Sequence, residues 1–186
     1  MSKIYTSREQ VSRAFNKVRV ELWKQGVLWD GSKLETVGYI YDRVPIECIW
    51  RKAEGLWKKK LNAIVFPMLY LAGGKKDSSL DIFRHEFGHA LADRYPKALQ
   101  KGALFRKAFG GAYSDKPARG TDPADWEGRC VSSYAAKETR EDFAETFMFF
   151  VKHKGKMPAK FAKSPAICRK WKAVAEIVRR VAASER

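Results

Sequence analysis

The chain contains little cysteine and no long hydrophobic run. Its three cysteines, Cys48, Cys130 and Cys168, are odd in number and widely spaced. This pattern argues against a disulfide framework or a four-cysteine zinc site, and we expect buried thiols. No run of about 20 apolar residues is present, which argues against a transmembrane helix. Residues 1–5 lack the apolar stretch of a signal peptide, so we expect a cytoplasmic protein, or one exported without a conventional signal peptide.

Acidic residues are scarce relative to basic residues. Asp and Glu total 21 against 37 Lys and Arg, which gives a formal net charge of +16 at pH 7. Such a charge attracts polyanions, including nucleic acid, acidic protein surfaces and anionic envelopes. The basic residues are scattered along the sequence, so a generally solvated surface explains them equally well. The charge therefore identifies no single partner.

Histidine is also rare, but two of the three histidines lie in a chemically specific motif. The stretch His85-Glu86-Phe87-Gly88-His89 places two histidines four residues apart. On an α-helix, His85 and His89 would stand about one turn apart on one face and could bind the same ion. Zinc held by imidazoles lowers the pKa of a water ligand towards about 7, and a neighbouring carboxylate can accept its proton. The motif predicts a zinc site in which Glu86 acts as general base for peptide-bond hydrolysis.

The residues around the motif favour a helix. Ser78 or Ser79 can cap its start, and Tyr95-Pro96 can end it. Apolar residues recur with helical spacing at Leu80, Phe83, Phe87 and Leu91. Glycine inside a helix costs about 1 kcal/mol relative to alanine, so Gly88 indicates that another backbone approaches closely there. We expect this neighbour to be a second metal-bearing segment.

Residues 132–150 form the second informative segment. Thr139 can cap a helix that runs to about Lys152. Its residues are apolar almost all round, yet Glu141 and Glu145 project from one side at four-residue spacing. Buried carboxylates need partners, which a metal ion and a metal-bound histidine would supply. An acidic pair stabilised by the helix dipole is the alternative interpretation.

Together these two segments resemble the gluzincin metallopeptidases, and most closely the catalytic domain of anthrax lethal factor. That family carries a His-Glu-Phe-Gly-His helix, then a tyrosine seven residues before a glutamate ligand, then another glutamate four residues further on. The matching positions here are Tyr134, Glu141 and Glu145. The resemblance, which covers roughly residues 80–150, implies that Glu141 is the third zinc ligand and that Glu145 holds a ligand histidine in place. It also implies that Tyr134 faces the substrate oxyanion.

The remaining sequence predicts helices around a small sheet. Ser7 and Gln10 form a capping box for an amphipathic helix that ends near Gly26. Strands are expected over residues 34–41, 46–51 and 61–72, the last of which is kinked at Pro67. The segment 61–72 would be either an ordinary core strand or a sheet edge that holds an extended peptide. Two further expectations are a short helix over 98–109 and a surface loop over 110–128 that is long enough to form a lid.

The last segment predicts a terminal helix that begins after Ser164-Pro165. Its apolar face contains Ile167, Trp171, Val174, Ile177, Val178 and Val181. This spacing favours packing on the core over binding to a membrane or to nucleic acid. The third histidine, His153, is expected at the surface and not at the metal.

We therefore expect one globular α+β domain over residues 1–186, mostly helical with a small sheet, that binds one Zn²⁺ per chain. Its expected activity is that of a zinc-dependent endopeptidase acting on a protein or peptide substrate, with a toxin- or effector-like role compatible with that chemistry. The alternative is a basic nucleic-acid-binding module whose zinc site is vestigial or acts on nucleoprotein. A cell-wall amidase or peptidase attracted to anionic polymer would use the same chemistry.

Overall fold

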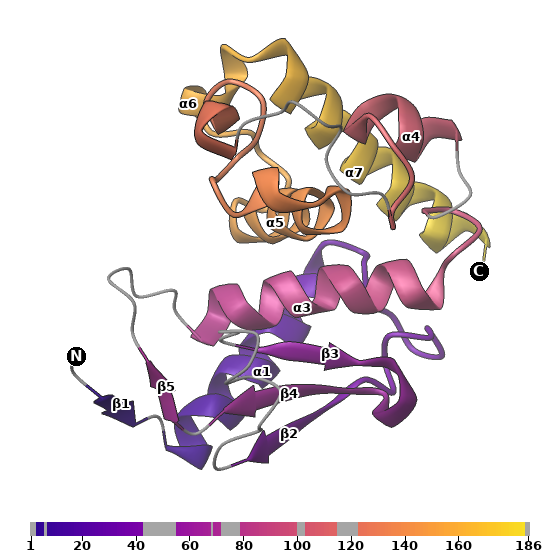
Figure 1. Ribbon diagram of the computed structural model, residues 1–186. Helices are drawn as coiled ribbons and strands as arrows, with labels where there is room; N and C mark the ends of the chain where they lie inside the picture. Colours follow the sequence, from indigo (N-terminus) through magenta and orange to yellow (C-terminus); the bar gives the residue numbers. More distant parts are fainter. Residues whose placement is uncertain are drawn as a thin grey trace.

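The protein is a mostly helical α+β structure with a small three-stranded mixed sheet (Figure 1). The computed structural model describes residues 3–5, 7–42, 55–67, 69–71, 79–99, 103–114 and 123–184. Its elements are, in chain order, β1 (Lys3–Tyr5), α1 (Arg8–Lys24), β2 (Gly38–Asp42), β3 (Leu56–Lys58), the 3₁₀ turn η1 (Lys59–Leu61), β4 (Ala63–Pro67), β5 (Leu69–Leu71), α3 (Ser79–Arg94), α4 (Ala103–Phe109), the 3₁₀ turns η2 (Pro123–Trp126) and η3 (Ala135–Lys137), α5 (Thr139–Lys152), α6 (Ala159–Ala162) and α7 (Pro165–Ser184).

Some of the sequence predictions lie outside the described residues. These are the features predicted at Cys48 and Ser78, the strand over 46–51 and the middle of the loop over 110–128. Within the described ranges, no helix has both the length and the apolar character needed to cross a membrane.

The sheet has the strand order β2-β4-β3, so β4 is its central strand. It runs parallel to β2 and antiparallel to β3, with Ile64 opposite Tyr39 on one side and Trp57 on the other. Strand β5 pairs instead with β1, in a separate antiparallel pair. The prediction of one kinked strand over 61–72 is therefore wrong, because two short strands occupy it. The first of them ends at Pro67, which has no N–H group with which to continue a strand ladder.

Helix α1 confirms the predicted capping box. The Ser7 hydroxyl accepts a hydrogen bond from the Gln10 N–H, and the Gln10 side chain accepts one from the Ser7 N–H. The strand that follows begins at Gly38, four residues later than predicted. Leu34 and Val37 lie in the turn segment that precedes β2. Their side chains are buried in the core, which explains why they are apolar although they do not belong to a strand.

Helix α3 lies in the middle of the molecule and carries the histidine motif. The sheet and α1 lie on one side of it, and α5 with the other C-terminal helices lies on the opposite side (Figure 1). Phe83, Phe87 and Leu91 are fully buried, as their spacing predicted. Packing on both sides fixes the position of the motif relative to the sheet and to α5.

Helix α7 packs against α4 and α5, which confirms that the terminal helix docks on the core. Its predicted apolar positions are all buried. Lys170 of α7 also forms a buried ion pair with Asp142 of α5, with Nζ and Oδ2 2.5 Å apart. Of the two described cysteines, Cys130 is buried as expected and Cys168 is only half-buried.

Helix α5 begins one residue earlier than the predicted cap implies. Thr139 is its first helical residue, and Glu138 occupies the cap position with extended backbone angles. The Glu138 carboxylate is paired with Arg140 at 2.6 Å and does not cap the helix. The helix ends at Lys152, as predicted.

Candidate zinc site

Helices α3 and α5 bring three potential metal ligands together. One donor atom from each of His85, His89 and Glu141 lies within 4.8 Å of the others. The His85 Nε2 atom is 3.1 Å from Glu141 Oε2 and 3.2 Å from His89 Nε2, which in turn is 3.4 Å from the same carboxylate oxygen. Ligands bound at 2.0–2.2 Å to a tetrahedral zinc ion lie roughly 3.3–3.6 Å apart. The three donor atoms therefore fit one zinc ion with little movement.

Gly88 allows the two helices to approach this closely. A Cβ atom at position 88 would lie 3.1 Å from the Ala144 Cα atom and 3.2 Å from the Phe147 ring. Both contacts are tighter than ordinary van der Waals contact, and the first is with the backbone of α5. The expectation that another backbone approaches closely at Gly88 is confirmed, and the approaching segment, α5, carries Glu141.

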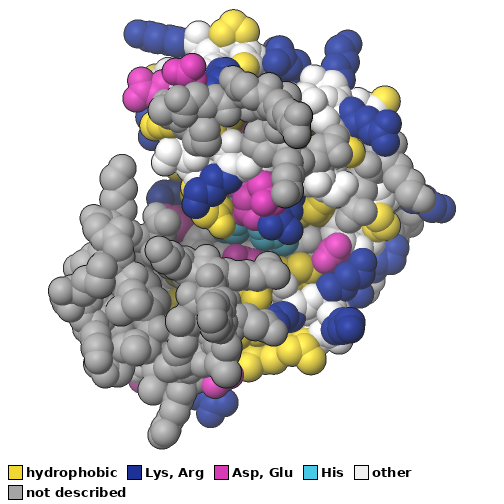
Figure 2. Space-filling view, in the orientation of Figure 1, with side chains coloured by type: hydrophobic (Ala, Val, Ile, Leu, Met, Phe, Trp, Pro, Cys, Tyr) yellow, Lys and Arg dark blue, Asp and Glu magenta, His cyan; other side chains and the backbone are white. Residues whose placement is uncertain are grey.

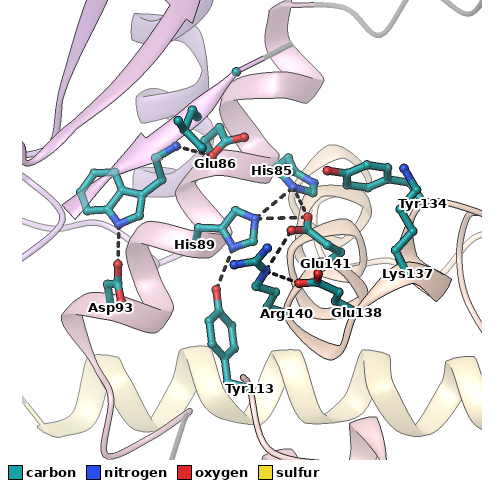
Figure 3. A pocket seen from close by; sticks show the side chains of 13 residues that line it. His85, Glu86, His89, Asp93, Tyr113, Tyr134, Lys137, Glu138, Arg140 and Glu141 are labelled. Carbon is teal, nitrogen blue, oxygen red and sulfur yellow. Dashed lines mark hydrogen bonds and ion pairs between the residues drawn. The ribbon is translucent and has the colours of Figure 1, made fainter. Parts of the chain in front are cut away.

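The outer nitrogen of each imidazole has its own partner. His85 Nδ1 lies 2.8 Å from Glu145 Oε1, and the other oxygen of that carboxylate accepts a hydrogen bond from the Ser132 hydroxyl at 2.6 Å. His89 Nδ1 lies 2.7 Å from the Tyr113 hydroxyl (Figure 3). When each Nδ1–H donates outward, each Nε2 lone pair points at the position between the three ligands.

The charges of the cluster also favour a cation. Burial lowers the pKa of His85, but hydrogen bonds with Glu141 and Glu145 outweigh this and raise the pKa to about 10. Burial raises the pKa of Glu141, but its hydrogen bonds with the two histidines hold that pKa well below its usual range. The carboxylates thus stabilise a positive charge among the imidazoles, which a divalent cation would supply in place of the proton.

Glu86 lies on the side of α3 that faces the sheet. Its side chain is buried, and its Oε2 atom accepts a hydrogen bond of 2.6 Å from the Trp57 backbone N–H of β3. Trp57 also donates its indole N–H to Asp93 at 2.7 Å, so β3 is attached to α3 at two points. A Cβ atom at Gly55 would lie 2.5 Å from Ile82, which shows how closely the start of β3 packs against α3.

Tyr134 lies just before η3, on the opposite side of His85 from Glu86 in Figure 3. Its ring centroid is 5.7 Å from that of His85, and 43% of the residue is exposed. Burial of the remainder, together with the charges of Glu141 and Glu86, raises the pKa of Tyr134 above its usual range. The hydroxyl therefore keeps its proton at neutral pH and can act as a donor.

These side chains open into a cleft of about 660 Å³. It is lined by residues of β3, α3 and α5, by Tyr113 after α4 and by the segment around η3. Figure 2 shows histidine side chains in a hollow of this face, with acidic and basic side chains beside them. Considering only the residues that the structure describes, the site opens to solvent.

The structure adds residues that the sequence did not single out. Tyr113 belongs to the surface loop predicted over residues 110–128, and Trp57 precedes the strand predicted over residues 61–72; neither lies in a local motif. Trp57 reaches the site because β3 packs against α3, and Tyr113 reaches it because its ring packs against Phe105 and Phe143. No spacing rule identifies such long-range contacts. His153, which was expected at the surface, is half-buried and stacks on Phe149, and it does not belong to the described ligand cluster.

Comparison with known protein families agrees with this geometry. A family model described as "Putative zinc-binding metallo-peptidase" matches residues 77–175, more than half of the chain. The matched region contains both helices that supply the ligand cluster. No curated protein and no solved structure shows a significant match. The chain therefore belongs to this family of zinc-binding metallopeptidases.

Proposed function

We propose that the protein is a zinc-dependent endopeptidase whose single zinc ion is held by His85, His89 and Glu141. The observation that carries this proposal is the convergence of two imidazole nitrogens and one carboxylate oxygen in an open cleft. Two histidines and one glutamate form a known catalytic zinc shell, in which a fourth position is left for water or substrate. When bound, zinc lowers the pKa of that water and polarises the carbonyl group of the substrate.

Glu86 is proposed as the general base. One of its carboxylate oxygens is fixed by the Trp57 N–H, which leaves the second oxygen to accept a proton from the attacking water. The same carboxylic acid then donates this proton to the leaving amine. Burial beside the ligand cluster keeps the carboxylate in the cleft through both steps.

Tyr134 is proposed as the donor to the oxyanion that forms on the substrate carbonyl. Its protonated hydroxyl lies on the ring that packs beside His85, at the wall of the cleft. Such a donor stabilises the transition state more than the ground state, because charge develops on the oxygen only as the water attacks. Glu145 and Tyr113 do not touch the substrate in this scheme; they hold the two imidazoles in place.

Strand β3 is proposed to position the substrate backbone. Among the described residues it pairs with β4 on one side only, and Leu56 and Trp57 line the cleft. An extended peptide can lie along such an edge, and the Trp57 N–H, which donates to Glu86, would not take part in its pairing. The sequence left open such an edge within residues 61–72; there, β4 is the central strand of its sheet, and β5 pairs with β1 in the separate pair.

Three finer expectations from the sequence remain proposals. The spacing of Tyr134, Glu141 and Glu145 supports the likeness to anthrax lethal factor, and no solved structure tests it. A toxin- or effector-like role and a cell-wall substrate would both use the same site. The competing class, a basic nucleic-acid-binding module, draws its support from the charge of +16 alone.

A peptide-library digest tests the proposed function against that competitor. The zinc-loaded protein should cleave internal peptide bonds, lose this activity with a chelator and recover it when zinc is restored. It should show no strong, salt-dependent affinity for duplex DNA. A protein that cleaves no peptide but binds DNA with a steep salt dependence would belong to the competing class.

A further inference from the structure

The cleft contains a lysine whose charge is not matched by a described carboxylate. Lys137 lies at the end of η3 and is exposed at the cleft wall. Its Nζ atom lies 4.3 Å from the centroid of the Tyr134 ring, which is a cation–π contact. In the described part of the chain, no carboxylate lies within ion-pair distance of this ammonium group.

The neighbouring cation, Arg140, is already paired. Its Nε atom lies 2.6 Å from Glu138 and 3.3 Å from Glu141. These contacts offset the charge of Glu138, the acidic residue next to Lys137. Of the two described cations that line the cleft, Arg140 is therefore ion-paired, whereas Lys137 forms no ion pair with a described carboxylate; both are labelled in Figure 3.

The position of Lys137 is set by the short turn that carries it. The Lys137 N–H donates to the Tyr134 carbonyl at 3.1 Å, and the Ala135 N–H donates to the Ser132 hydroxyl at the same distance. Ser132 in turn donates to Glu145, so the turn is connected to the partner of His85. These bonds fix the backbone of Lys137 next to the segment that holds Ser132 and Tyr134.

The distance from Lys137 to the ligand cluster fits a nearby substrate residue. The Tyr134 ring centroid is 4.3 Å from the Lys137 ammonium and 5.7 Å from the His85 ring centroid, so the ammonium lies within about 10 Å of that imidazole. An extended peptide rises about 3.3 Å per residue. An acidic side chain up to roughly three residues from the scissile bond can therefore meet Lys137.

We propose that Lys137 selects peptide substrates that carry Asp or Glu within about three residues of the scissile bond. This inference rests on the proposed endopeptidase function and adds the chemical class of its substrate. The ammonium group would exchange its contact with the Tyr134 ring for an ion pair, or keep both. The overall charge of +16 would further favour the approach of acidic segments.

Matched peptide pairs test the inference. Each pair has one cleavable sequence with Glu or Gln at a single position, scanned over three residues on either side of the scissile bond. The readout is the ratio of kcat/KM for the Glu peptide to that for the Gln peptide, because a general loss of activity cancels in this ratio. For the wild type we expect a ratio of about five at one or more positions, the upper range for a partly exposed ion pair.

Variants locate the source of the preference. Lys137→Met should bring the ratio to about one, Lys137→Glu should bring it below one, and Lys137→Arg should retain it. Lys17→Glu is the matched control, because Lys17 is exposed on α1 outside the cleft and the change in net charge equals that of Lys137→Glu. This control should keep the wild-type ratio.

The possible failures are distinguishable. A wild-type ratio of one at every position, or a ratio that survives Lys137→Met, would overturn the role of Lys137 while leaving the peptidase intact. A ratio that Lys17→Glu lowers as much as Lys137→Glu would assign the preference to overall charge and also overturn it. If the zinc-loaded wild type cleaves no peptide, the proposed function fails, and this inference fails with it.

Discussion

Two side chains that are not proposed metal ligands fix the orientation of the His85 and His89 imidazoles. Glu145 holds Nδ1 of His85, and Tyr113 holds Nδ1 of His89. A ligand histidine needs its free lone pair on the nitrogen that faces the metal, and a partner on the other nitrogen selects that tautomer. At the scale of single residues, the site therefore includes side chains that lie outside the His85–His89 motif.

Replacing Tyr113 by phenylalanine tests this role. We expect Tyr113→Phe to weaken zinc binding by a factor of about 10 to 100, the usual cost of losing the partner of a ligand histidine. The measurement is the zinc dissociation constant from competition with a coloured chelator. Tyr39→Phe removes the same atom from a tyrosine that packs against Phe15 and Phe83 in the core, away from the cleft, and should leave zinc affinity unchanged. Equal affinities for wild type and Tyr113→Phe would make the Tyr113 contact incidental.

At the scale of elements, the site depends on how closely α3 and α5 pack. Glycine usually weakens a helix, yet Gly88 lies in the middle of α3 where the added atom of alanine would press on the backbone of α5. The two helices carry all three proposed ligands, so their separation sets the spacing of the donor atoms. Helix propensity and site geometry therefore favour different residues at this position.

Gly88→Ala should consequently impair the site although alanine is the better helix former. The gain in helix propensity is about 1 kcal/mol, but the new Cβ would meet Ala144 Cα at 3.1 Å and force the helices apart. We expect a lower zinc affinity and a lower melting temperature. Gly38→Ala in β2 is the control, because nothing lies within 4 Å of a Cβ atom there. A Gly88→Ala protein that binds zinc normally and melts at a higher temperature would show that α5 can yield.

Sequence periodicity accounts for much of this level of structure. The helical spacing around Phe83 and Phe87, the cap at Ser7 and the terminal helix after Ser164 all predicted real elements, because each rests on contacts local in sequence. The prediction of a single strand over residues 61–72 was wrong, because an apolar run does not specify its pairing partners. The two halves of this range pair with different strands. Partners such as Tyr113 depend on long-range packing, which leaves no periodic signal.

At the scale of the whole molecule, a zinc ion would connect two layers of the fold. Its ligands come from α3, which packs on the sheet and α1, and from α5, which packs on α7. The buried apolar cluster continues from α1 to α7, through residues of both layers. We therefore propose that residues 1–186 unfold as one domain and that zinc stabilises this domain as a unit.

Removing zinc should lower the melting temperature in a single transition. A free zinc concentration a thousand times the dissociation constant stabilises the folded state by about 4 kcal/mol, which corresponds to a shift on the order of 10 °C for a chain of this size. Thermal melts with zinc and with a chelator measure this shift. His89→Ala should abolish it, and His153→Ala, which removes the histidine outside the cluster, should retain it. A shift that persists in His89→Ala would place the zinc elsewhere.

The most direct test of the central claim is the rate of peptide hydrolysis by Glu86→Gln. Glutamine has nearly the shape of glutamate and can still accept the Trp57 N–H, but it cannot take a proton from water. Zinc content and melting temperature should match the wild type, because Glu86 is not among the three proposed ligands. The account predicts that kcat/KM on a verified peptide falls at least about 100-fold, the contribution expected of a general base. Cleavage by zinc-loaded Glu86→Gln at the wild-type rate would contradict it.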